Sequence, residues 1–89
     1  MVTKTAVVIN EQGLHMRPAG ALAKKVKEYA DCEVLLKAND KTVKANSPMQ
    51  IMSACMKKGC QVEIVCNGQN EDKALEEIVQ MFNDGFGEM

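Results

Sequence analysis

The order of strand-like and helix-like segments constrains the fold of this chain more than any other feature of its sequence. Four segments are rich in β-branched residues or alternate between apolar and polar residues, as strands do. Three others show helical apolar spacing or lie between helix start and stop signals. The predicted order is therefore β-α-β-β-α-β-α. The expected strands are 2–9, 32–38, 41–45 and 61–66, and the expected helices are 16–29, the segment between Ser47 and Gly59, and the segment between Asn70 and Gly85.

The longer predicted elements each have a single apolar side. The first and last helices carry one apolar stripe, and the strands at 32–38 and 61–66 alternate in polarity. Such elements need burial on one side only, so we expect an α+β open-faced sandwich with one sheet covered on one face. The residues expected to face the core are Ala19, Leu22, Ala23, Val26, Ala30, Val34, Leu36, Ala38, Val62, Ile64, Cys66, Ala74, Leu75, Ile78, Val79 and Phe82.

Turn and capping residues set the expected boundaries. Asn39-Asp40 is a turn signal, so the strands on either side should form a hairpin, and Asn67-Gly68 should turn the chain again. Ser47 is expected to cap the second helix, and Gly59 is expected to close it after two lysines. Asn70 is expected to cap the last helix, whose first turn is acidic.

Size and composition exclude several classes of function. A chain of 89 residues is expected to form one domain, spanning 1–89, without the deep cavity that a large cofactor needs. The formal net charge of −1 and the three aromatic residues argue against a nucleic-acid binder, which needs basic patches or stacking platforms. No run of 18 apolar residues predicts a membrane span, so membrane insertion is not expected.

The cysteine pattern and the N-terminus indicate a cytoplasmic protein. The first residues lack a charged region followed by a hydrophobic one, so no signal peptide is expected. Cys32, Cys55, Cys60 and Cys66 form no Cys-x-x-Cys pair and match no zinc module, so no metal site is expected. We interpret them as reduced thiols that serve as small core residues, although Cys55 and Cys60 flank a predicted helix end and so are candidates for exposure.

The single histidine lies in the segment Gly13-Leu14-His15-Met16-Arg17-Pro18-Ala19, where a glycine turn brings the imidazole to the start of a predicted helix. Helix N-termini attract anions through unpaired N–H groups and the positive end of the helix dipole. That dipole disfavours imidazolium, so the His15 ring should be largely neutral and nucleophilic. Arg17 supplies a guanidinium for the remaining charge. The arrangement predicts a place where a ring nitrogen of His15 accepts a phosphoryl group.

Nothing else in the sequence completes an enzyme around His15. No carboxylate adjoins it in the sequence, Glu11 being the nearest at four residues, and no glycine-rich nucleotide loop is present. The phosphoryl donor and acceptor must therefore arrive on other proteins. We expect a carrier without turnover of its own, with no bound cofactor or metal.

The motif at 13–19 resembles the active site of HPr, the histidine-containing phosphocarrier of the bacterial phosphoenolpyruvate:sugar phosphotransferase system. The similarity extends over essentially the whole chain, including the element order, the hairpin at Asn39-Asp40-Lys41-Thr42-Val43 and the Ser47 segment. The resemblance implies a four-stranded antiparallel sheet with three helices on one face. It also implies a cytoplasmic monomer.

The resemblance further implies how the carrier works. His15 would accept a phosphoryl group from phosphorylated enzyme I and pass it to the A domain of sugar-specific enzyme II. Arg17 would steady the phosphoryl group, and Pro18 matches the start of the family's helix. The family uses Nδ1 of the ring, whereas the residues alone leave both ring nitrogens open.

Ser47 is a second candidate site. A helix N-cap before a proline explains this serine fully. In HPr proteins of low-GC Gram-positive bacteria, however, a serine at the matching place is phosphorylated by the HPr kinase/phosphorylase, which favours binding to a repressor in carbon catabolite control. Phosphate at a helix N-terminus is compatible with the fold. The sequence departs from the family pattern at Asn46, at Pro48 and at Gln50. At the position of Gln50 the family commonly has a glycine. Pro48 is expected to affect how a kinase binds this loop.

An apolar surface is the third candidate feature. The resemblance implies that partners dock on the second helix and the start of the first, and flexible methionines suit a surface that meets several partners. Met16, Gly20, Met49 and Met52 are the expected contacts. Two alternatives stay open. The chain is either a paralogue in a regulatory phosphorelay, or a small protein-binding or sensing module in which His15 is incidental.

Overall fold

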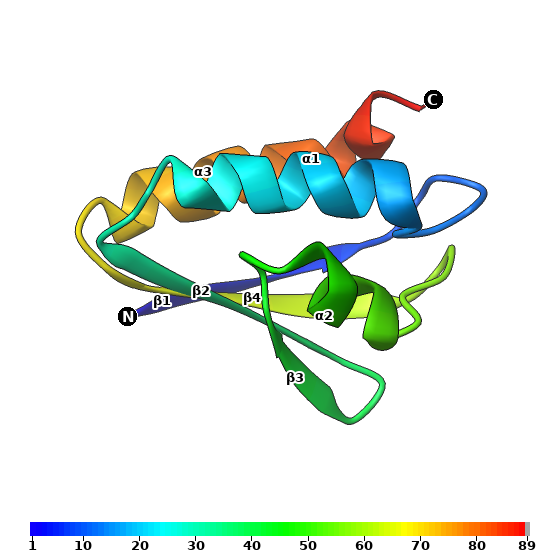
Figure 1. Ribbon diagram of the computed structural model, residues 1–89, viewed down its shortest axis with the longest axis horizontal. Helices are drawn as coiled ribbons and strands as arrows, with labels where there is room; N and C mark the ends of the chain where they lie inside the picture. Colours follow the sequence, from blue (N-terminus) through cyan, green and yellow to red (C-terminus); the bar gives the residue numbers. More distant parts are fainter. Residues whose placement is uncertain (89) are drawn as a thin grey trace.

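The computed structural model describes residues 1–88, and it confirms the predicted order of elements (Figure 1). A short 3-10 helix, η1, follows the last helix and was not predicted. The elements are β1 (Val2–Val7), α1 (Met16–Lys27), β2 (Cys32–Ala38), β3 (Lys41–Lys44), α2 (Pro48–Ser53), β4 (Gln61–Gly68), α3 (Glu71–Asn83) and η1 (Gly85–Gly87).

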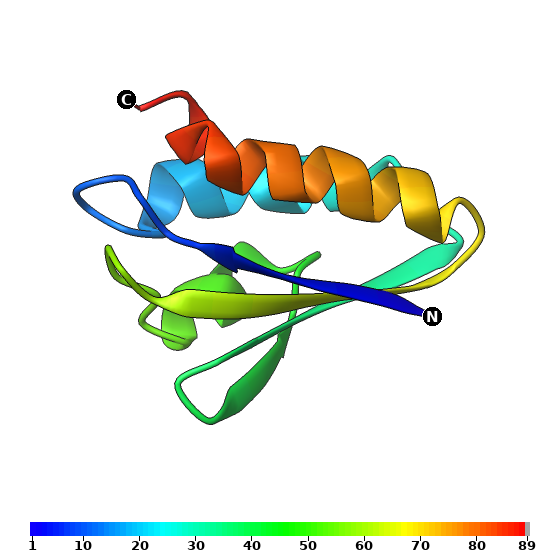
Figure 2. The ribbon, with the colours of Figure 1, turned by 180° about the vertical axis from the view of Figure 1, so that it is seen from behind.

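The four strands form one antiparallel sheet in the order β1-β4-β2-β3. Helices α1 and α3 lie side by side across one face of it, and α2 packs against α1 and β3 (Figures 1 and 2). The prediction of an α+β open-faced sandwich is thereby confirmed. The N-terminus of the sheet and the loop between β1 and α1 lie at opposite ends of the molecule (Figure 2).

The core lies between the sheet and the helices. The alternating residues of β2 and β4 that were expected to face inward are buried, as is nearly all of the stripe on α1 and α3. Burial of each large apolar side chain contributes roughly 1.5–3 kcal/mol. Two predicted core residues are exceptions: Leu75 is only half-buried at the margin of the core, and Ala30 is exposed because α1 ends before it, at Lys27. The fully buried large side chains include Leu22, Leu36, Ile64, Ile78 and Phe82.

The β2–β3 connection is the predicted two-residue hairpin turn. Asn39 has a φ of 52° and Asp40 a φ of 64°, the left-handed pair that matches the twist of the flanking strands. The side chain of Asn39 also donates from Nδ2 to the carbonyl oxygen of Ala54 at 2.8 Å. The turn therefore also contacts the residues that follow α2.

The predicted end of the second helix was wrong. Helix α2 stops at Ser53, because Cys55 has a φ of 53° and leaves the helical path. Gly59 lies beyond it in a loop, where its N–H donates to the carbonyl oxygen of Val8 at 2.7 Å. The loop therefore pairs with the end of the first strand instead of prolonging the helix.

Other boundaries also moved. Asn67 and Gly68 end β4 rather than turning the chain, because they pair with Glu33 and Cys32 of β2. The segments expected at 2–9 and 16–29 are shorter, as the bounds of β1 and α1 show. Asn70 stands at the N-cap of α3 as predicted, with a φ of 59°, but its side chain makes no capping hydrogen bond within the described residues.

The cysteines divide into two pairs by burial. Cys32 and Cys66 are buried core residues, as predicted, and burial raises the pKa of the Cys66 thiol to about 12. Cys55 is exposed and Cys60 is half-buried, so the interpretation as core residues was wrong for Cys55. Among residues 1–88, no helix is long and apolar enough to cross a bilayer.

Candidate functional site

The loop between β1 and α1 is held tightly against the segment that follows α2. The N–H of Leu14 donates to the carbonyl oxygen of Met56 at 2.9 Å. Gly13 has a φ of 65°, and a Cβ at this position would stand 2.4 Å from the same Met56 oxygen. Only glycine suits that combination of left-handed backbone and close approach. Gly13 therefore fixes the path of the loop that leads to His15.

His15 is the N-cap residue of α1. Its backbone is extended, and its carbonyl oxygen accepts the first helical hydrogen bond from the N–H of Ala19 at 3.0 Å. The ring makes no capping bond within the described part of the chain, and the side chain is 34% exposed. The imidazole is thus open to a partner at the point where the N–H groups of the first turn are unpaired.

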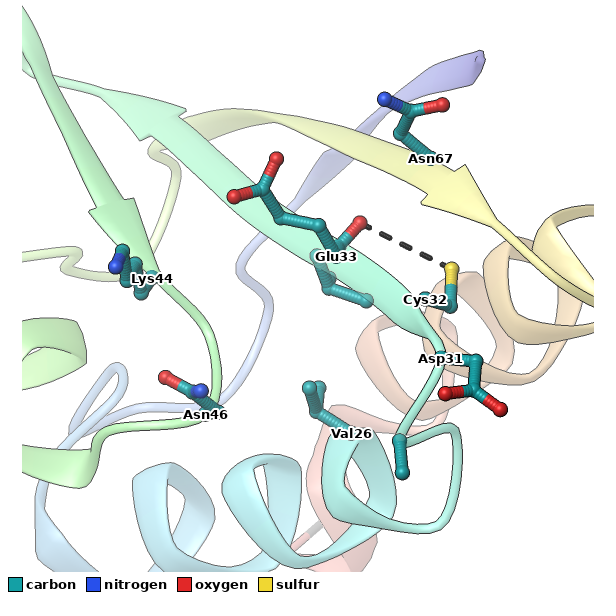
Figure 3. Close-up of a pocket in the computed structure, with 9 residues that line it drawn as sticks. Val26, Asp31, Cys32, Glu33, Lys44, Asn46 and Asn67 are labelled. Atoms are coloured by element: carbon teal, nitrogen blue, oxygen red, sulfur yellow. Dashed lines mark hydrogen bonds between the residues drawn. The ribbon is translucent and has the colours of Figure 1, made fainter.

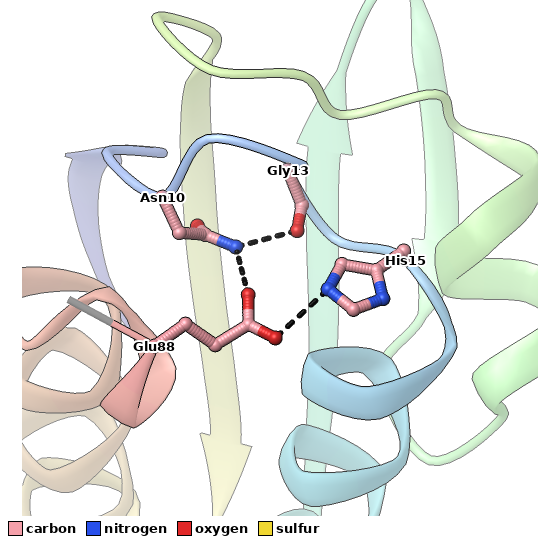
Figure 4. A network of polar contacts seen from close by, with 4 residues as sticks. All are labelled: Asn10, Gly13, His15 and Glu88. Atoms are coloured by element: carbon pink, nitrogen blue, oxygen red, sulfur yellow. Dashed lines mark hydrogen bonds and ion pairs between the residues drawn. The ribbon is translucent and has the colours of Figure 1, made fainter.

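A carboxylate that was not predicted from the sequence lies against this ring. His15 Nε2 is 2.8 Å from Oε2 of Glu88, which follows η1 at the far end of the chain (Figure 4). Glu11, the nearest carboxylate in sequence, instead pairs with Lys58. His15 and Glu88 are 73 positions apart in the chain. The only sequence feature that could have indicated this contact is an acidic residue after the glycines that end the last helix.

Asn10 connects the loop to Glu88. Its side chain is 1% exposed, and Nδ2 donates to the carbonyl oxygen of Gly13 at 2.6 Å and to Oε1 of Glu88 at 2.9 Å. Oδ1 of this amide is buried without a partner among residues 1–88. An unpaired buried acceptor costs roughly 1–3 kcal/mol. The reverse orientation is worse, since it would set Oδ1 against two other oxygens.

The contacts of Glu88 keep it ionised. The hydrogen bond from Asn10, and then that from His15, hold the pKa of the Glu88 carboxyl below its ordinary value, while partial burial opposes them. The charge of Arg17 acts in the same direction as the hydrogen bonds. Arg17 is exposed on the first turn of α1, and its guanidinium shares one open hollow with the His15 imidazole and the Glu88 carboxylate. The other residues that line this hollow are Glu11, Gln12 and Gly87.

The expected position of Pro18 is in the first turn, and the structure places it there. Helix α1 begins at Met16, and Pro18 is buried, whereas His15 is half-exposed and Arg17 is exposed. A proline is tolerated here because the N–H groups of a first turn have no intrahelical partner.

Ser47 caps α2 as expected. Its Oγ accepts from the N–H of Gln50 at 3.4 Å, and Pro48 occupies the first helical position. Gln50 reaches back with its side chain, and its Oε1 accepts from the N–H of Lys44 at 3.0 Å. The Gln50 side chain thus connects α2 to the end of β3.

The four residues expected to dock partners differ in exposure. Met16 is 72% and Met49 79% exposed, while Met52 is half-buried against the core, so only Met49 of the two α2 methionines is fully open to a partner. Gly20 is half-buried, and within residues 1–88 nothing lies within 4 Å of an added Cβ. Helices α1 and α2 pack together, so these residues come from neighbouring elements.

A second hollow lies at the C-terminal end of α1 and is lined by residues such as Val26, Cys32 and Asn46 (Figure 3). None of the expected site residues lines it. His15 stands at the other end of the same helix, so the hollow is remote from the site.

A half-exposed imidazole at a helix N-terminus, in one hollow with a guanidinium, is typical of a carrier of phosphoryl groups. Comparisons with known proteins agree. The family model described as "PTS HPr component phosphorylation site" matches residues 2–84. The chain therefore belongs to the HPr family of phosphocarrier proteins of the phosphotransferase system, which are carriers and not enzymes.

Individual relatives cover nearly the whole chain. The chain is 40% identical over 88 residues to phosphocarrier protein NPr of Klebsiella oxytoca, covering 98% of this chain and 97% of the relative. It is 34% identical to phosphocarrier protein HPr of Chlamydia trachomatis, covering 90% of this chain and 72% of the relative. The crystal structure of HPr-C-His from Thermoanaerobacter tengcongensis superposes with a TM-score of 0.93 at 29% identity, covering 100% of this chain and 99% of that one.

Proposed function

We propose that His15 carries the phosphoryl group, which it takes from phosphorylated enzyme I and delivers to the A domain of an enzyme II. The observation that carries the proposal is the half-exposed ring at the N-cap of α1, in one hollow with Arg17. Incubation with phosphoenolpyruvate and enzyme I tests it, because a carrier gains one acid-labile, base-stable phosphate. A binding or sensing module gains none.

Arg17 is proposed to neutralise the phosphoryl oxygens beside His15. We predict that Arg17→Ala slows transfer from enzyme I roughly 10- to 100-fold, since one charged donor is lost while the helix N–H groups remain. Rapid-quench measurement of transfer checks this. Lys27→Ala, which removes an equal charge from the last turn of α1, is the control. Equal rates for the Arg17 variant and the wild type would remove Arg17 from the site.

A regulatory phosphorelay is the second candidate setting for the same chemistry. The NPr relatives of Klebsiella oxytoca and Escherichia coli are 40% and 35% identical to this chain, while the HPr proteins of Chlamydia trachomatis and Chlamydia muridarum are 34% and 30% identical. Comparing transfer from the enzyme I of a sugar system with that from its relay paralogue separates the two settings. The faster donor identifies the pathway.

Ser47 is proposed as a regulatory phosphorylation site for an HPr kinase/phosphorylase, with a repressor of carbon catabolite control as the partner of the modified form. Its support is position, because the half-buried hydroxyl stands at a helix N-cap, where added negative charge is tolerated. The exposed Met49 lies two residues away, so a phosphate on Ser47 would change the charge beside the proposed docking surface.

Incubation with ATP and the kinase should give acid-stable phosphoserine on Ser47. We predict that Pro48→Ile leaves this labelling equal or stronger, because the proline limits how the loop can enter a kinase active site. Mass spectrometry of both proteins checks the result, with Ser53→Ala as a control for labelling elsewhere on α2. Loss of labelling in Pro48→Ile would show that the proline does not hinder the kinase.

The docking surface of the proposed carrier consists of Met16, Gly20, Met49 and Met52. Its two most exposed members project from α1 and α2. In this proposal the chain works as a single-domain, cytoplasmic monomer, and its four free thiols suit that compartment.

A further inference from the structure

We propose that Lys58 is a positioning residue for phosphoryl transfer: its ammonium binds the Glu11 carboxylate, so that this carboxylate does not compete with the phosphoryl group for Arg17. The inference rests on the proposed function, because it concerns the hollow in which His15 would carry that group. Lys58 lies outside the motif at 13–19, in the loop that follows α2.

The hollow beside His15 contains a carboxylate that works against the binding of an anion. Glu11 lines this hollow together with His15 and Arg17, and its side chain is 82% exposed. The planar donors of a guanidinium fit a carboxylate as well as they fit a phosphoryl group. A carboxylate without another partner would therefore repel the phosphoryl group and also compete with it for Arg17.

Lys58 supplies that other partner. Its Nζ donates to Oε1 of Glu11 at 2.6 Å, although the two residues are 47 positions apart in the chain. The hydrogen bond from Lys58, and then its charge, hold the pKa of the Glu11 carboxyl below its ordinary value, while desolvation opposes them. The Glu11 carboxylate is thus ionised and already paired before any partner protein arrives.

Arg17 is left without an ion pair in the part of the chain that the structure describes. Its guanidinium shares the hollow with two carboxylates, yet Glu11 pairs with Lys58 and Glu88 pairs with His15. The N–H donors of the guanidinium therefore stay available for an anion that arrives on another protein.

The transferred group is negatively charged throughout the step. A ring nitrogen of His15 forms the new bond to phosphorus, the bond from phosphorus to the donor's leaving atom breaks, and its electron pair stays on that atom. The phosphoryl oxygens keep their charge, so an unpaired guanidinium beside them lowers the free energy of the transition state relative to the separate proteins.

Transfer rates of single and double variants test the role of Lys58. In Lys58→Ala the Glu11 carboxylate loses its partner, so we expect kcat/KM for transfer from enzyme I to fall roughly threefold, the scale of an exposed charge contact. Lys58→Arg keeps the cation and should keep the wild-type rate. In the double variant Glu11→Gln/Lys58→Ala the competing charge is also gone, so the rate should return to the wild-type value.

Lys57→Ala is the matched control, because it removes an equal charge from the neighbouring exposed residue. Positive charge that only attracts partner proteins would make the two lysine variants equally slow. We expect Lys57→Ala to match the wild type. Carbon-13 titration of the Glu11 carboxyl gives a second readout, in which its pKa rises toward the ordinary value in Lys58→Ala and stays lowered in Lys57→Ala.

Three results would each overturn the positioning role: a wild-type transfer rate in Lys58→Ala, a double variant as slow as Lys58→Ala, or an unchanged pKa of Glu11 in Lys58→Ala. Failure of the proposed function looks different. The wild-type chain would then take up no phosphate from enzyme I, and the positioning role would fall with it, while the titration would still detect the pair of Glu11 and Lys58.

Discussion

His15→Ala should abolish phosphorylation by phosphoenolpyruvate and enzyme I while leaving the fold intact. The ring supplies the attacking nitrogen, and no other imidazole exists in the chain to replace it. The side chain is 34% exposed and caps nothing within the described residues, so its removal should change the free energy of unfolding by no more than about 1 kcal/mol. Radiolabelling and chemical denaturation measure the two effects separately.

The single histidine makes this experiment unusually direct. Any acid-labile, base-stable phosphate on the wild-type chain has only one imidazole on which to reside. Undiminished labelling of His15→Ala would therefore refute the assignment of the phosphoryl acceptor. Loss of labelling together with loss of cooperative unfolding would point to a structural role of the ring instead.

Gly13→Ala should strongly destabilise the protein. The alanine would be strained at a φ of 65°, and its Cβ would meet the Met56 oxygen at 2.4 Å and Cα of Lys57 at 2.9 Å. Both neighbours are backbone atoms that cannot rotate away, so strain and clash together should cost roughly 3 kcal/mol or more. For a chain of this size, that lowers the Tm by on the order of 15 °C.

Gly20→Ala is the matched control for stability. Gly20 lies inside α1 with open space around an added Cβ among the described residues, and alanine is the better helix former. We expect a gain of about 0.5–1 kcal/mol. Thermal unfolding of both variants checks the comparison. A Gly13 variant that loses less than about 1 kcal/mol would contradict the close approach to Met56.

Features with local determinants could be predicted from the sequence. The hairpin at Asn39-Asp40 depends on two residues that accept left-handed backbone, and the capping of α2 depends on Ser47 and the proline after it. The glycine turn that places His15 at the start of α1 is likewise recognisable from adjacent residues, although contacts with the distant Met56 hold the loop in place. For these features, neighbouring residues contain enough of the physical cause for a prediction.

Features decided by distant contacts could not be predicted. Glu88 reaches His15 only because α3 and η1 return the chain to the loop after β1, and no local pattern announces that contact. Helix α2 ends early because Cys55 turns into a segment that pairs with Val8. The half-buried state of Met52 depends on how α2 is rotated over the sheet, which spacing alone leaves undetermined.

The position of Glu88 matters to anyone who attaches a label to this protein. An affinity tag or fluorophore joined behind η1 would hang beside the imidazole, where it would compete with incoming partners for space. Met1 is the better attachment point, because it lies at the opposite end of the molecule, with its amino group 2.9 Å from Glu71 (Figure 2). Transfer rates measured with a label behind η1 should therefore differ from those measured with a label at Met1, even though the amino acids of the carrier are the same.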